Sequence, residues 1–186
     1  EAGQVALTET SSDVAELARE VTDMLRPRAE QGGLMLTLDM PALPAMVRVD
    51  TIKLRQILIN LLGNAIKFTH QGSVSLIIHA SPAAVGRVNI TFKACDTGIG
   101  IAEQDRQKIF EPFVQMVTHA TTSGTGLGLA ITRQYLQMLG SGLEIDSTPG
   151  VGSCFHFTLQ LPVVEAGASP PGVHPARTGL APASRG

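Results

Sequence analysis

The sequence has no tryptophan, one tyrosine and only two cysteines among its 186 residues. Cys95 and Cys154 lie far apart and belong to no CxxC or Cys/His cluster, so neither forms part of a recognisable metal-binding or redox motif. This scarcity favours two free thiols in a reducing compartment. A disulfide between neighbouring strands is the alternative.

The sequence also lacks a long apolar run and a strong excess of charge. No stretch approaches the roughly 18 apolar residues that a membrane-spanning helix needs, and no signal peptide is visible. The net charge of −2 gives no reason to expect nucleic acid or an anionic membrane as a partner. Because the first residue is Glu1 rather than Met, we expect the chain to be a piece of a longer protein.

Hydrophobic residues make up 44% of the chain, which suffices for one buried core. Their spacing predicts helices over residues 12–30, 51–68, about 103–110 and about 126–139. It predicts strands over residues 34–40, 73–80, 87–95, 143–147 and 153–161. These elements indicate an α/β (α+β) fold, a two-layer sandwich in which a mixed β-sheet packs on helices. We expect one domain over residues 1–163, and the Ala, Pro, Gly and Ser-rich residues 164–186 to be a disordered linker or tail.

The helix predicted over residues 51–68 carries a polar stripe beside its apolar face. At about 100° per residue, the stripe consists of Lys53, Gln56, Asn60, Asn64 and Lys67. Periodicity alone favours a solvated face. However, asparagine is a poor helix former, so two asparagines on adjacent turns suggest a function. Their amide oxygens can ligate Mg²⁺ or its waters, and Lys67 can offer a positive charge to phosphate.

Two glycine-rich segments follow this helix along the chain. The segment 96–100, with sequence DTGIG, is either a tight turn or a carboxylate at a strand end that accepts a hydrogen bond from an amine such as that of adenine. The segment 124–129, with sequence GTGLGL, leads into a helix and is either a hinge or an anion site at the helix N-terminus. Its spacing excludes a P-loop and a dinucleotide-binding fingerprint.

Four motifs in order resemble those of sensor histidine kinases. Residues 60–64 resemble the N box, 96–100 the first glycine box, 109–113 (IFEPF) the F box and 124–129 the second glycine box. The resemblance covers roughly residues 8–162. The sequence around the N box is especially similar to that of hybrid kinases. The resemblance implies the Bergerat ATP-binding fold, with ATP and Mg²⁺ as the bound cofactors.

The resemblance also implies a role for each matched residue. Asp96 would bind the adenine amine, Asn60 and Asn64 would be the catalytic, Mg²⁺-holding residues, and residues 114–125 would form a mobile lid. The full set that the resemblance implies for nucleotide binding is Asn60, Asn64, Lys67, Asp96, Gly98, Gly100, Ile101, Phe113, Gly124, Thr125, Gly126, Leu127 and Gly128.

Asn60 separates two branches of this family. The ATP-hydrolysing relatives carry a glutamate at this position, whereas asparagine cannot act as a general base. The resemblance therefore implies a histidine kinase that transfers the γ-phosphoryl group to a histidine, in preference to an ATPase of the gyrase or chaperone branch. None of the five histidines lies in the His-Glu/Asp context of the phosphoacceptor, so we expect that histidine on a separate dimerisation domain.

The predicted lid, residues 114–125, contains no Lys or Arg, whereas many relatives place a basic residue there. This departure supports an alternative, a degenerate and non-catalytic nucleotide-binding signalling platform. In the kinase interpretation, the partners are the dimerisation and phosphoacceptor helices of the same protein and a receiver domain or response regulator. The whole protein would be a homodimer and an inner-membrane sensor, and this part would be cytoplasmic, without direct membrane contact.

Overall fold

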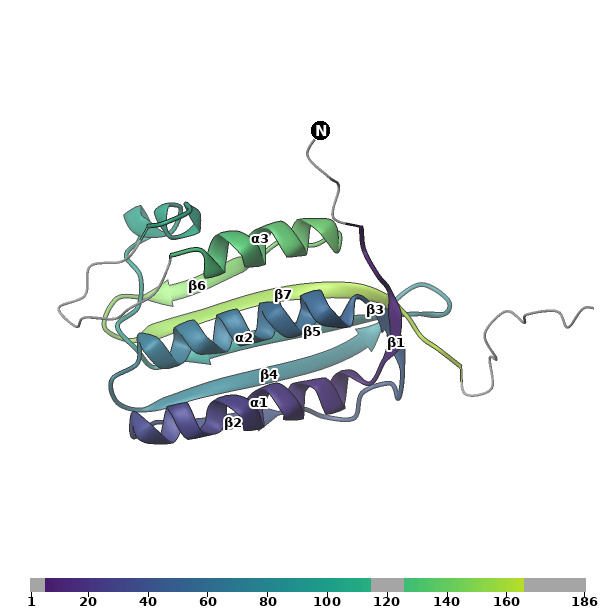
Figure 1. Ribbon diagram of the computed structural model, residues 1–186, viewed down its shortest axis with the longest axis horizontal. Coiled ribbons are helices and arrows are strands. Elements are labelled where there is room, and N and C mark those ends of the chain that lie inside the picture. The colour runs from purple at the N-terminus through teal and green to yellow at the C-terminus, as the bar shows by residue number, and fades with distance from the viewer. Residues whose placement is uncertain (1–5, 115–125, 166–186) are drawn as a thin grey trace, which may run out of the picture.

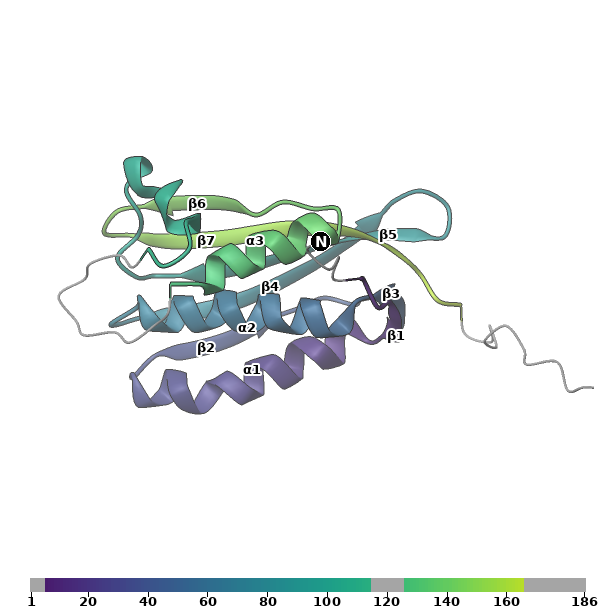
Figure 2. The same ribbon diagram turned by 45° about the horizontal axis from the view of Figure 1, so that its top comes forward.

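A five-stranded sheet carries three helices on one of its faces, so the chain forms two layers (Figures 1 and 2). The computed structural model describes residues 6–114 and 126–165. The strand order is β2 (Met35–Asp39), β4 (Ser73–Pro82), β5 (Arg87–Asp96), β7 (Gly152–Pro162) and β6 (Glu144–Thr148). The helices are α1 (Val14–Gln31), α2 (Thr51–Lys67) and α3 (Gly128–Met138). Strands β2 and β4 are parallel and the other pairs antiparallel, which confirms the predicted mixed sheet.

Helix α2 lies between α1 and α3 and packs its apolar face on the sheet (Figure 1). It begins after Asp50, whose side chain accepts a hydrogen bond from the Lys53 N–H at 3.1 Å and so caps the helix. Leu54, Ile57, Leu58, Leu61 and Leu62 are buried, as the apolar periodicity predicts. The polar stripe lies beside this apolar face, on the side of α3, where the Asn60 amide donates to Gly128 and Thr132.

Alternation along the central strands separates the core from the outer face. On β5, Val88, Ile90, Phe92 and Ala94 are buried, and Phe92 stacks on Phe157 of β7 at 4.9 Å between ring centroids. The outer face is polar. There, the Thr91 and Thr158 hydroxyls of the same two strands form a hydrogen bond of 2.8 Å.

The structure differs from the sequence expectations in three respects. A second, two-stranded sheet pairs β1 (Thr10–Ser12) with β3 (Val47–Val49), and neither strand is long enough to show an alternating pattern. The helix expected over 103–110 is two 3₁₀ turns, η1 (Glu103–Asp105) and η2 (Lys108–Phe110). Helix α3 begins two residues later than expected because Gly126, at φ 71°, has a left-handed backbone.

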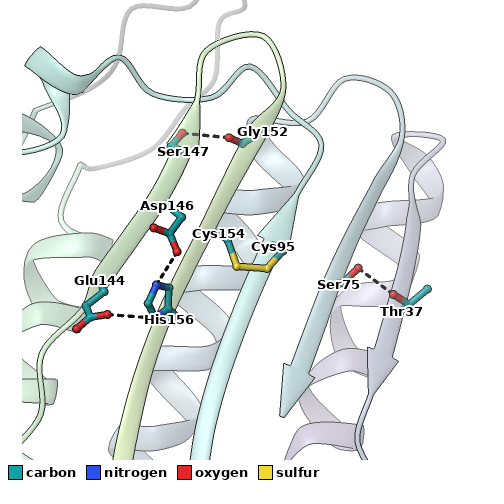
Figure 3. Close-up of a disulfide and its surroundings, with 9 residues drawn as sticks. All are labelled: Thr37, Ser75, Cys95, Glu144, Asp146, Ser147, Gly152, Cys154 and His156. Atoms are coloured by element: carbon teal, nitrogen blue, oxygen red, sulfur yellow. Dashed lines mark hydrogen bonds and ion pairs between the residues drawn. A yellow bond between two sulfur atoms is a disulfide. The ribbon is translucent and has the colours of Figure 1, made fainter. Parts of the chain in front are cut away.

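The preference for two free thiols is wrong. Cys95 on β5 and Cys154 on β7 form a disulfide, with their Cα atoms 4.0 Å apart (Figure 3). The strand register places the two residues directly opposite each other on the same face, which their distance in the sequence concealed.

Among the described residues, no helix combines the length and the apolar character needed to cross a membrane.

Candidate functional site

A cavity of about 320 Å³ lies where α2, the start of α3, and the ends of β5 and β7 meet. Eight of the thirteen residues expected to bind nucleotide line it, although they come from three separate stretches of the sequence. These are Asn60, Asn64, Lys67, Asp96, Gly100, Ile101, Gly126 and Gly128. With Ile109 of the F box, which also lines the cavity, the fold brings residues of all four motifs to one place.

The other expected residues do not line the cavity or lie outside the described part of the chain. Gly98 lies just behind the wall, where its N–H donates to Asp96. Phe113 has 72% of its surface exposed and Leu127 is not part of the lining, so the structure does not bring these two to the cavity. Gly124 and Thr125, like almost all of the predicted lid, fall within residues 115–125, outside the described residues.

Asp96 is the last residue of β5 and presents its carboxylate at the cavity wall. Burial raises its pKa, and hydrogen bonds from the backbone N–H groups of Gly98, at 2.8 Å, and Ser153 partly offset that rise. The carboxylate is therefore half-buried, fixed in orientation and free to accept a further hydrogen bond from a ligand.

The glycines beside Asp96 permit close backbone approach. A Cβ on Gly98 would lie 2.4 Å from the Phe68 carbonyl oxygen, so no larger residue fits there. Gly100 has a φ of 70°, and a Cβ on it would lie 2.1 Å from the Thr148 carbonyl oxygen. Backbone hydrogen bonds from the Ile99 N–H to the Phe68 carbonyl oxygen, at 3.3 Å, and from the Gly150 N–H to the Ile99 carbonyl oxygen, at 2.7 Å, hold this loop against the end of α2 and the β6–β7 hairpin.

The two asparagines of α2 have different environments. The Asn60 side chain accepts a hydrogen bond from Gln56 at 2.8 Å and donates to the Gly128 carbonyl oxygen at 3.2 Å and to Thr132 at 3.3 Å. It therefore ties α2 to the first turn of α3. Asn64 lines the cavity, and among the described residues no hydrogen bond joins its amide to another residue.

Two cationic side chains line the cavity, Lys67 from α2 and Arg28 from the last turn of α1. Arg28 reaches the cavity across Gly63, where a Cβ would lie 3.7 Å from the guanidinium Nη1. Lys67 lies with its ammonium 5.3 Å from the centroid of the Phe68 ring. The cavity thus offers positive charge and an aromatic surface beside the Asn64 amide.

Several lining residues were not among those expected to bind nucleotide. Gly63, Ile99 and Ile109 belong to the recognised motifs, whereas Arg28, Ser153 and Phe155 lie outside them. Strand alternation placed Phe155 on the same face as Phe157, and it could have identified Ser153 as well. No local signal marks Arg28, because its contact with α2 depends on how the two helices pack.

Few side chains at this cavity could supply the oxygen ligands that a divalent cation needs. The described residues contain no group of three His, Cys, Asp or Glu side chains that could hold a metal ion. The neutral Asn64 oxygen is a hard donor that suits Mg²⁺, but only as one ligand among several. The site therefore fits a cation that arrives with the oxygens of its own ligand and with water.

Comparison with known proteins supports the motif-based expectation. Residues 49–163 match the family described as histidine kinase-, DNA gyrase B-, and HSP90-like ATPase. The autoinducer 2 sensor kinase/phosphatase LuxQ of Vibrio cholerae is 37% identical over 182 residues, covering 95% of this chain and 21% of LuxQ. The chain spans about a fifth of the length of the curated relatives it matches.

Solved structures agree with this relationship. Full-length ShkA in complex with AMPPNP superposes with a TM-score of 0.75 at 36% identity, covering 89% of this chain and 34% of ShkA. The catalytic domain of histidine kinase ThkA superposes with a TM-score of 0.66 at 26% identity, covering 84% of this chain and 96% of that domain. The predicted fold is thereby confirmed, and the chain belongs to the family of histidine kinase-, DNA gyrase B- and HSP90-like ATPases as a catalytic domain of the sensor histidine kinase type.

Proposed function

We propose that this domain binds ATP with Mg²⁺ in the cavity and transfers the γ-phosphoryl group to a histidine on a separate dimerisation domain. One observation carries the proposal. A single cavity holds the Asp96 carboxylate, the Asn64 amide and the Lys67 and Arg28 cations. These are the groups needed for an adenine amine, a Mg²⁺ ion and a triphosphate, respectively.

In this proposal the adenine and the phosphates of ATP contact different residues of the cavity. Asp96 accepts a hydrogen bond from the adenine amine, and apolar residues of the lining such as Ile101 and Phe155 contact the ring. Lys67 and Arg28 face the phosphates, and the N-terminus of the 11-residue helix α3 adds backbone N–H groups. Asn64 would hold Mg²⁺, which neutralises phosphate charge during transfer.

Asn60 decides between transfer and hydrolysis in this account. Its amide cannot remove a proton from water, and its N–H₂ group already donates to Gly128 and Thr132. The domain therefore positions ATP for an incoming nucleophile without activating water. Catalysis then rests on orientation and on electrostatic stabilisation of the moving phosphoryl group.

Calorimetric titration with ATP, with and without Mg²⁺, tests the site. Asp96→Asn should weaken binding roughly 10- to 100-fold, since a hydrogen bond to a charged group is lost. Asn64→Ala should abolish the Mg²⁺ dependence. Asn89→Ala, on the outer face of β5, is the matched control and should bind like the wild type. Unchanged binding in both site variants would overturn the assignment.

A non-catalytic signalling platform is the second candidate, because residues 114–125 include no basic side chain. Such a domain would bind ATP without transferring phosphate. Arg28 and Lys67 argue against it, since they supply positive charge at the cavity from α1 and α2. Incubation with a phosphoacceptor segment and labelled ATP discriminates the two functions.

The wider setting follows from the kinase proposal. The partners would be the dimerisation and phosphoacceptor helices of the same protein and a receiver domain or response regulator, as in a hybrid kinase. We propose a homodimeric, membrane-anchored sensor in which this domain is cytoplasmic. Sedimentation of the longer protein, and its recovery in membrane fractions, test these two statements.

A further inference from the structure

The Cys95–Cys154 disulfide lies on the opposite face of the sheet from the proposed nucleotide cavity. Successive residues of a strand point to opposite faces, so the two cysteines lie on the outer face of the sheet while their neighbours Asp96 and Ser153 face the cavity. Figure 3 shows the disulfide joining β5 and β7 on that outer face, beside the polar side chains of β6. One covalent bond thus joins the two strands immediately behind the adenine-binding carboxylate.

The disulfide is open to solvent on its outer side. Both cysteines line a second, open hollow between β5 and the β6–β7 hairpin, and both are only half-buried. Asp96 and Ser153 line this hollow and the nucleotide cavity alike. A small thiol can therefore reach the sulfur atoms without entering the nucleotide site, and a change there acts on residues that the two hollows share.

The disulfide lies near the end of the paired part of β5 and β7, next to Asp96 and Ser153. The pairs Cys95–Cys154 and Asp96–Ser153 are the last two of the β5–β7 ladder, where paired strands fray most readily. The Ser153 N–H also donates a hydrogen bond to the Asp96 carboxylate. Because the disulfide holds this end of the ladder closed, it also holds Asp96 in its binding orientation.

We propose that Cys95–Cys154 is a thiol–disulfide exchange site whose oxidised form holds Asp96 and Ser153 in place for nucleotide and whose reduced form releases them. The proposal rests on the nucleotide-binding function proposed above. In the forward step, a thiolate of a dithiol reductant attacks one sulfur, the S–S bond breaks, and the other cysteine leaves as a thiolate and takes up a proton. The second thiol of the reductant then attacks the mixed disulfide, so the reductant is oxidised to its disulfide and both cysteines become thiols. A disulfide oxidant reverses the reaction.

Nucleotide affinity in defined redox states tests this proposal. The chain is equilibrated with reduced or oxidised dithiothreitol, thiols are counted by alkylation and mass spectrometry, and ATP binding is measured for each form. We expect the reduced form to bind about fivefold more weakly, the effect of losing roughly one well-placed hydrogen bond. The Cys95→Ser/Cys154→Ser variant should match the reduced form and ignore the redox state. Thr91→Ala/Thr158→Ala, which removes another cross-strand contact on the same face, should keep the response.

Hydrogen exchange of the Ser153 amide provides a readout that needs no nucleotide. We expect exchange of this amide to accelerate at least several-fold on reduction, since fraying exposes it. Equal affinity and equal exchange in the two forms, with the thiol count confirming reduction, would overturn the inference. So would the finding that the oxidised chain retains two free thiols. If neither form binds ATP but reduction accelerates the exchange, the nucleotide-binding function fails and the control of the Asp96–Ser153 pair stands.

Discussion

Asp96 is the residue whose ionisation matters most for the proposed function. Burial raises its pKa above the usual 3.8, and the hydrogen bonds from Gly98 and Ser153 only partly oppose this. Because the folded-state pKa exceeds the unfolded one, the ionised carboxylate costs folding stability at neutral pH, and protonation at low pH relieves that cost. The ionised side chain therefore adds no folding stability, in keeping with its proposed role in binding.

The pH dependence of nucleotide affinity follows from this shift. ATP affinity should decrease as the pH falls toward the raised pKa of Asp96, beginning at a higher pH than an unperturbed aspartate would allow. Calorimetry with adenosine, which has no phosphates that titrate, isolates the effect of Asp96. Asp96→Asn should bind adenosine weakly and without this dependence. A wild-type affinity that stays constant down to pH 4 would contradict the assigned role.

Arg28 is expected to act on the phosphates alone. Arg28→Ala should weaken ATP binding by roughly 10-fold, the range of a lost charge-assisted hydrogen bond, and leave adenosine binding unchanged. Arg19→Ala removes the same charge from an exposed position on α1 that does not line the cavity, and serves as the control. Equal effects of the two substitutions would reduce the role of Arg28 to general electrostatics.

At the scale of elements, α2 depends on a buried ion pair at its start. Asp50 is 1% exposed and its carboxylate accepts hydrogen bonds from the Thr8 N–H and the Lys53 ammonium, each at 2.9 Å. Burial would raise the pKa of Asp50, but these hydrogen bonds together outweigh it and lower the pKa. The stability that Asp50 contributes is therefore present above about pH 4 and is lost as the pH falls through its lowered pKa.

Removing this carboxylate should be costly. Asp50→Ala should lower the free energy of unfolding by about 3–5 kcal/mol, because Lys53 is left buried without its partner. Asp13→Ala removes the more exposed cap of α1 and should cost about 1 kcal/mol. Urea denaturation of both variants at neutral pH measures the difference. Similar losses would show that the ion pair adds little beyond capping.

Helices and strands could be predicted from the sequence wherever a local pattern of apolar residues marks them. The apolar spacing of α2 and the alternation along β5 and β7 gave these elements to within a residue or two, because one face of each is buried. The motifs also pointed to eight residues that the fold brings together at the cavity. Contacts that depend on packing or register left no such signal, which is why Arg28 and the short β1–β3 sheet were missed and the Cys95–Cys154 disulfide was only the less favoured alternative.

At the scale of the whole molecule, the arrangement suits a domain that prepares ATP for another protein surface. Asn60 is held against α3 and offers no base, so rapid hydrolysis by this domain alone is not expected. Val114 and Gly126, the described residues on either side of 115–125 in the sequence, both line the cavity. In the kinase proposal, we expect an incoming histidine to approach near the start of α3, which lines the cavity.

Phosphotransfer to histidine tests this account most directly. The chain is mixed with the dimerisation and phosphoacceptor segment of the same protein and with ATP labelled on its γ-phosphate, and acid-labile, base-stable label on that segment is measured. We predict labelled phosphohistidine with the wild type, at least 100-fold less with Asn64→Ala, and little free phosphate in either case. A domain that binds ATP but leaves the segment unlabelled, or that releases phosphate rapidly without it, would contradict the kinase assignment.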